Sequence, residues 1–96
     1  MIQVEKYNVR VVQVGEAYGR NDCLINDKAP MVEFYDARYN DPSFMGRGQF
    51  VSRYYVDTIL DGDYPGGLCL DGGIPEWTVG PAAMFQVKQY IAGVAA

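Results

Sequence analysis

Alternation of apolar and polar residues with a period of two is the feature that most constrains this fold. It runs through residues 2–14, which are rich in valine, and returns in Met31–Tyr35. Because successive side chains of a strand point to opposite faces of a sheet, this period predicts strands. In the second of them Val32 and Phe34 are predicted to share one face, with Glu33 and Tyr35 on the other. The apolar phase shifts after Lys6, which predicts either a bulge in one long strand or a change of strand partner near Tyr7.

Two segments have the spacing of helices instead. In residues 50–59 the apolar side chains gather on one side of a helical wheel, and Arg53 and Asp57 fall on the other. A helix is therefore predicted there, with Gly62 as its terminator. A second helix is predicted after Pro81, where apolar residues recur at helical spacing.

The segment between these predicted helices is rich in glycine and proline, which favour turns. Short strands are predicted within it, at residues 68–70 and at residues 76–79. Two helices separated by strands, with antiparallel hairpins possible on either side, favour an α+β fold, here a small antiparallel sheet with two helices on one face. The chain has 96 residues and shows no linker or internal repeat, so residues 1–96 are expected to form a single domain.

The chain contains no histidine, and this excludes several classes of chemistry. Ser-His-Asp triads, His-ligated zinc and proton transfer by imidazole all require that residue. Cys23 and Cys69 form no CxxC pair, which excludes a zinc ribbon and a thioredoxin-like motif. Cys69 lies between two leucines and is expected to be a small buried hydrophobic residue.

No glycine motif for phosphate binding follows a predicted strand, and residues 61–72 depart from the pattern of a calcium loop. We therefore expect no cofactor and no metal, and we assign no catalytic residue. Direct binding of nucleic acid is not expected either, because the chain as a whole is negatively charged.

Charge is divided unevenly along the chain, whose net charge is −4. Residues 38–53 carry three bases and one acid, whereas residues 54–87 carry five acids and no base. If these acidic side chains emerge on one side, they form a negative field that attracts a basic partner surface. The alternative is a solvated acidic face that only keeps the protein soluble. The five acids are Asp57, Asp61, Asp63, Asp71 and Glu76.

Aromatic residues are more numerous than one small core can hide, with eight tyrosines and one tryptophan. Phe85 lies on the side of the last predicted helix opposite its apolar residues, so it is expected to be exposed in a single copy of the chain unless the sheet or a partner covers it. A second copy of the chain is one such partner, and a helix buried on two sides is the alternative. Since aromatic residues often anchor interfaces, we add Tyr64, Trp77 and Phe85 to the five acids as candidate partner-binding residues.

Four blocks of the sequence together resemble a family of short uncharacterised proteins carried by phages, plasmids and other mobile elements of proteobacteria. They cover about half of the chain and are MVEFYDARY (31–39), GQFVSRYYVDTIL (48–60), GLCLDGG (67–73) and IPEWTV (74–79). The resemblance brings no catalytic residue with it. It implies a genomic setting in which small acidic proteins often inhibit host defence, anti-CRISPR proteins among them.

The leading hypothesis is a non-enzymatic, anti-CRISPR or anti-restriction type of inhibitor that occupies a basic nucleic-acid-binding site on a host protein. No basic leader and no run of about 18 apolar residues is present, so we expect no membrane partner and a cytoplasmic location. Two alternatives stay open. One is a small enzyme, or enzyme subunit, that uses a carboxylate or thiol near Trp77; the other is a structural or assembly protein that dimerises through its last helix.

Overall fold

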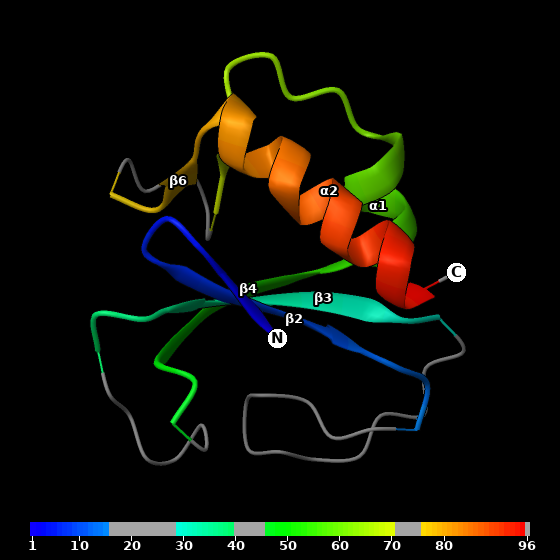
Figure 1. Cartoon of the computed structure of the whole chain (residues 1–96), viewed down its shortest axis with the longest axis horizontal. Helices are drawn as coiled ribbons and strands as arrows, with labels where there is room; N and C mark the ends of the chain where they lie inside the picture. The colour runs from blue at the N-terminus through cyan, green and yellow to red at the C-terminus, as the bar shows by residue number, and fades with distance from the viewer. Residues whose placement is uncertain (16–28, 40–45, 71–75, 96) are drawn as a thin grey trace.

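A four-stranded antiparallel sheet and two helices form two layers in the residues that the computed structural model describes, which are 1–15, 29–39, 46–70 and 76–95 (Figure 1). The strands of this sheet lie side by side in chain order and are β1 (Ile2–Val4), β2 (Tyr7–Val12), β3 (Met31–Asp36) and β4 (Gln49–Tyr55). The other elements are α1 (Val56–Asp61), a two-stranded sheet of β5 (Leu68–Cys69) and β6 (Thr78–Val79), and α2 (Pro81–Ala95). The predicted α+β class is confirmed.

The first valine-rich segment is a β-hairpin, so the prediction of one long strand is wrong and the change of strand partner is correct. Val4 of β1 pairs with Tyr7 of β2 across a turn at Glu5 and Lys6. Even-numbered residues of β1 therefore lie opposite odd-numbered residues of β2. The shift of the apolar pattern after Lys6 thus keeps the apolar side chains of both strands on one face of the sheet. Glu5 adopts the left-handed backbone conformation in this turn, with φ 54°.

The helix predicted over residues 50–59 is wrong in its first half, which forms β4 and pairs with β3. Aromatic and β-branched residues dominate this half, and such side chains fit the pleated surface of a sheet. The helix α1 begins only at Val56 and ends before Gly62, as predicted. Arg53 and Asp57 therefore lie in different elements and do not share a helix face.

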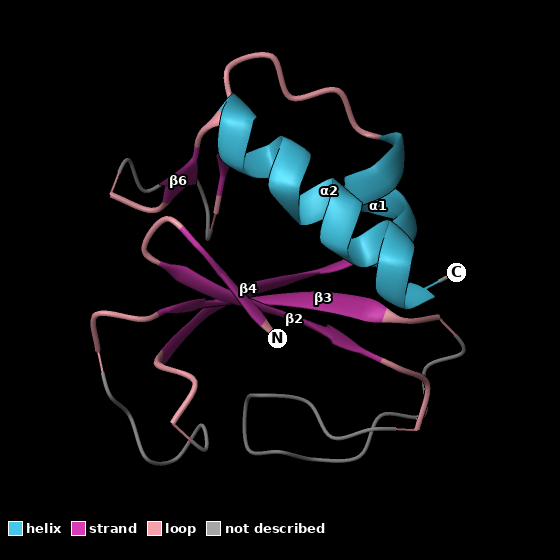
Figure 2. Cartoon of the chain, viewed as in Figure 1, coloured by secondary structure: helices cyan, strands magenta, loops and turns pink. Residues whose placement is uncertain are grey.

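Both helices pack on one face of the main sheet, as predicted (Figure 2). The strand register pairs Val9 with Phe34 and places the buried Val11 opposite Val32 on the same face. Buried helix side chains pack against this face, and four of them are at most 2% exposed: Ile59, Met84, Val87 and Ile91. Because burying one such side chain contributes roughly 1.5–3 kcal/mol, packing between the two layers is a main source of stability.

The small second sheet confirms the two short strands predicted in the glycine-rich region, in shortened form. Cys69 is exposed, so the prediction of a buried thiol is wrong, and the neighbouring Leu70 is fully buried instead. Adjacent residues of an extended chain point to opposite sides, which explains why Leu70 is buried when Cys69 is exposed. Cys23 lies outside the described residues. No helix in the described ranges is long and apolar enough to cross a membrane.

Candidate protein-interaction site

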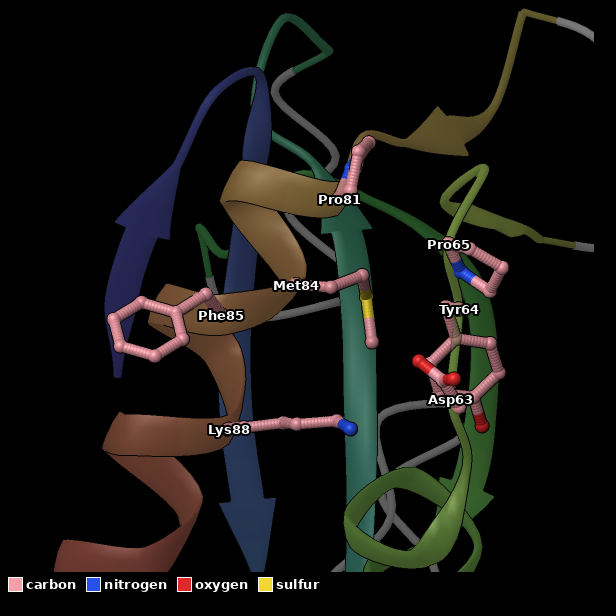
Figure 3. Close-up of a pocket in the computed structure, with 7 residues that line it drawn as sticks. All are labelled: Asp63, Tyr64, Pro65, Pro81, Met84, Phe85 and Lys88. Carbon is pink, nitrogen blue, oxygen red and sulfur yellow. The ribbon is translucent and has the colours of Figure 1, made fainter.

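A pocket lies between the loop that follows α1 and the first half of α2 (Figure 3). Its volume is about 230 Å³, and it is lined by Asp63, Tyr64, Pro65, Pro81, Met84, Phe85 and Lys88. Three of the predicted partner-binding residues, Asp63, Tyr64 and Phe85, therefore meet at one place. The other pocket residues from α2 escaped prediction, although their spacing puts side chains on one helix face; they are Pro81, Met84 and Lys88.

Tyr64 forms one wall of this pocket and is fixed by its contacts with the end of α1. Its hydroxyl donates a hydrogen bond to the carbonyl oxygen of Thr58 at 2.9 Å. The ring lies so close to Gly62 that a Cβ atom there would overlap it, so any other residue at this position would displace the ring. Burial raises the pKa of Tyr64 above its ordinary 10.0, so its hydroxyl stays protonated and able to donate well above neutral pH.

Met84 and Lys88 extend from α2 toward the loop that carries Asp63 and Tyr64 (Figure 3). Met84 is 2% exposed and supplies an apolar floor. The Lys88 ammonium donates a hydrogen bond to the carbonyl oxygen of Gly62 and lies 5.5 Å from the centre of the Tyr64 ring. A cation over an aromatic face contributes roughly 0.5–1 kcal/mol at an exposed site. Lys88 thus connects α2 to the loop after α1.

Three exposed carboxylates lie on α1 and at the mouth of the pocket: Asp57, Asp61 and Asp63. Asp57 and Asp61 are four residues apart and therefore lie on one side of α1. Within the described ranges none of the three takes part in an ion pair or a side-chain hydrogen bond. Like charges at this spacing repel each other, so internal stability of the helix does not explain the arrangement.

Phe85 extends the apolar surface of the site over the outer side of α2. Its side chain is 64% exposed. The ring points away from Tyr64 and Pro65, so it flanks the pocket rather than filling it (Figure 3). The exposed helix residues around it carry no charge and include Ala82, Gln86, Gln89 and Ala92. The exposure of Phe85 confirms the prediction made from its position on the helix.

Glu76 and Trp77 do not line this pocket. The indole N–H of Trp77 donates to an oxygen of Asp36 at 3.0 Å, and Glu76 accepts a hydrogen bond from Arg38 at 3.0 Å. Arg38 also forms an ion pair with the buried Asp36 at 2.6 Å. The hydrogen bonds that Asp36 accepts from Arg38 and from Trp77 hold its pKa at about 2, with Arg38 as the main cause. Glu76 and Trp77 therefore attach the chain before β6 to the end of β3.

The enzyme alternative requires Asp71, Glu76 and Trp77 to converge on a concave site. Asp71 lies outside the described residues, and the other two side chains are engaged with Arg38 and Asp36. In the described part of the chain no group of three or more cysteine, aspartate or glutamate side chains could hold a metal ion.

Comparison of the chain with protein-family models, with curated proteins and with solved structures finds no match. The chemistry of the pocket and its surroundings must therefore carry the functional argument. Apolar walls, a buried floor and carboxylates at the surface can bind a side chain of another protein. The hydroxyl of Tyr64 and the ammonium of Lys88 are both engaged in hydrogen bonds within the fold.

Proposed function

We propose that this protein is a non-enzymatic inhibitor that occupies a basic nucleic-acid-binding surface of a host protein, as anti-CRISPR or anti-restriction proteins of mobile elements do. The observation that carries the proposal is the pocket beside α1. Its apolar walls and the neighbouring carboxylates of Asp57, Asp61 and Asp63 provide both an anchoring point and negative charge. Proteins that bind nucleic acid present the complementary features, because their binding grooves are rich in arginine and lysine.

Electrostatics gives the proposed inhibitor a means to compete with nucleic acid. Acidic side chains attract a cationic groove before contact and raise the association rate. The attraction between exposed charges weakens beyond about 10 Å at 0.1 M salt. We therefore expect binding that is faster and tighter at low salt.

Apolar contacts supply the second part of the interaction. Interface energy is usually concentrated in a few well-packed residues, with aromatic side chains prominent among them. Phe85, with its 64% exposure, and the Tyr64 wall of the pocket are such residues on this face. Charge would thus guide the encounter, and these contacts would hold the complex together.

Capture from a bacterial lysate followed by competition with nucleic acid tests this function. Wild-type protein is used as bait, and each captured protein is tested for nucleic-acid binding by fluorescence anisotropy with and without the inhibitor. We expect the wild type to displace the nucleic acid. The double variant Asp61→Asn/Asp63→Asn should do so about tenfold less well, which corresponds to about 1.4 kcal/mol of binding free energy.

The matched control is Gln3→Lys/Glu5→Gln, which changes the net charge equally but on the β1–β2 hairpin. It should displace nucleic acid as the wild type does. Equal weakening by both double variants would mean that only net charge matters. Captured proteins that keep their nucleic acid in the presence of the wild type would contradict the proposal outright.

A second candidate function is assembly of two copies through α2. The observation that favours it is Phe85, which is 64% exposed on α2, where the other exposed side chains carry no charge. A second copy would bring the same uncharged face, so no like charges would meet at the centre of such an interface.

A further inference from the structure

We propose that the pocket between the α1 loop and α2 receives an arginine side chain of the partner protein, with its guanidinium paired to Asp63. This inference rests on the proposed function, because it names the residue by which a basic partner would be anchored.

The size of the pocket suits one side chain. Its volume is about 230 Å³, below the roughly 300–1,000 Å³ of sites that enclose whole small-molecule ligands. Tyr64, Pro65, Pro81 and Met84 present apolar or aromatic groups to it. Long basic side chains bury their methylene stems against such surfaces and keep the charged group at the edge. The walls therefore fit the stem of an arginine.

The charges at the pocket determine which end group fits. Lys88 is already held by the carbonyl oxygen of Gly62 and by the ring of Tyr64. Asp63 is exposed, and within the described ranges no ion pair or hydrogen bond engages its carboxylate. Asp57 and Asp61 keep the nearby surface negative. Lys88 forms no ion pair with Asp63, so we infer that a cation of the partner pairs with this carboxylate.

An arginine fulfils this requirement better than a lysine. Its planar guanidinium can bind both oxygens of one carboxylate, and it is less strongly hydrated than an ammonium group. The flat group also stacks on aromatic and proline rings, which a compact ammonium does less well. Asp63 has both oxygens available at the mouth of the pocket (Figure 3).

The experiment uses N-acetyl-arginine amide as the probe, titrated into the ¹⁵N-labelled full chain and followed by NMR. N-acetyl-citrulline amide has nearly the same shape without the charge, and N-acetyl-lysine amide keeps the charge without the planar group. We expect the arginine probe to shift the amide signals of Asp63, Tyr64 and Lys88. Asp63→Asn should weaken that binding about tenfold, as expected for loss of one charge-assisted pair. Glu5→Gln, at an exposed carboxylate in the turn between β1 and β2, should leave it nearly unchanged.

Each other outcome overturns the inference. Equal shifts with the citrulline or lysine probe would remove the arginine specificity, and shifts that persist in Asp63→Asn would remove the pairing. The two proposals can fail separately. Displacement of nucleic acid from a captured protein without binding of the arginine probe leaves the function and rejects the pocket assignment. Binding of the probe without displacement of nucleic acid supports the pocket assignment and rejects the proposed function.

Discussion

Asp36 connects parts of the chain that are far apart in sequence, because its buried carboxylate accepts hydrogen bonds from both Arg38 and Trp77. Arg38, as the main cause, holds the pKa of Asp36 at about 2, below its ordinary 3.8. The folded state therefore favours the ionised form more than the unfolded state does. Stability from this group is complete above about pH 4 and is lost as the pH falls through 2.

The first prediction concerns the variant Asp36→Asn. The free energy of unfolding of the wild type should fall by about 2 kcal/mol between pH 5 and pH 2 through Asp36 alone. The variant should be less stable at pH 7 and lack this part of the decrease, as measured by urea denaturation at each pH. Glu5→Gln, at an exposed carboxylate, is the control and should keep the wild-type profile. A decrease of the same size in Asp36→Asn would contradict the role of this group.

Single residues also show where sequence reasoning reaches its limit. Alternation correctly places Glu33 and Tyr35 on the face opposite Phe34. It does not show that Glu33 is fully buried and accepts hydrogen bonds from Arg10 at 2.5 Å and from the Tyr35 hydroxyl at 2.7 Å. The pairing of Arg10 with Glu33 depends on the register between β2 and β3, which distant parts of the chain decide.

At the scale of elements, α1 carries one aspartate in its first turn and one in its last. Negative charge is favourable at a helix N-terminus and unfavourable at its C-terminus, where the free carbonyl groups lie. Asp57 therefore stabilises α1, whereas Asp61 destabilises it. A residue that reduces helix stability and points to solvent is consistent with a role in binding.

The second prediction compares Asp61→Asn with Asp57→Asn. The first should raise the free energy of unfolding by about 0.5 kcal/mol, and the second should lower it by a similar amount. Urea denaturation at low ionic strength measures both, and added salt should reduce the difference because it screens exposed charges. Changes of the same sign in both variants would contradict the dipole argument. In the displacement assay Asp61→Asn should nevertheless bind less well, despite its greater stability.

The same region explains why one element was misread from the sequence. Spacing alone allows residues 50–59 to be helical, because their apolar side chains gather on one side of a helical wheel. Composition points the other way, since Phe50, Val51, Tyr54 and Tyr55 all favour strands. Pairing with the buried strand β3 decides between them. The terminal helix was predicted correctly because no strand-forming run competes with its spacing.

At the scale of the whole molecule, stability depends on contact between the two layers. The third prediction is that Ile91→Ala, at a fully buried residue of α2, lowers the free energy of unfolding by about 2–5 kcal/mol. Gln89→Ala, at an exposed position of the same helix, should change it by less than about 0.5 kcal/mol. Thermal and urea denaturation provide the measurement. Equal effects of the two variants would mean that α2 does not cover the sheet in solution.

The fourth prediction concerns assembly. If α2 forms an interface between two copies, the wild type should sediment as a dimer and Phe85→Lys as a monomer, because the interface would then bury two unpaired charges. Sedimentation velocity over a range of concentrations distinguishes the two states. Gln3→Lys, which adds the same charge on β1, is the control and should keep the wild-type behaviour. A monomer in both wild type and Phe85→Lys would reject assembly through this face.

Fold class, the terminal helix and the face of the sheet that both helices cover could be predicted from the sequence, because periodicity records which side of each element is buried. The start of α1 could not. The pocket could not. It exists because the Tyr64 ring lies against Gly62 and because α2 passes close to that ring. Neither contact can be derived from the spacing of residues within one element. The distribution of charge along the sequence indicated that Asp57, Asp61 and Asp63 are exposed. It did not indicate which of them border the pocket.

The packing of α2 against β1 and β2 has a consequence for the protein during its synthesis. Every strand of the main sheet leaves the ribosome before α2 does, yet this helix covers much of the apolar face that includes Val9 and Phe34. Because synthesis proceeds at roughly 5–20 residues per second, that apolar face stays exposed for some seconds before α2 is made. The nascent chain is therefore most vulnerable to aggregation and to proteases just before its last helix arrives, and translation speed through residues 56–95 should influence its yield.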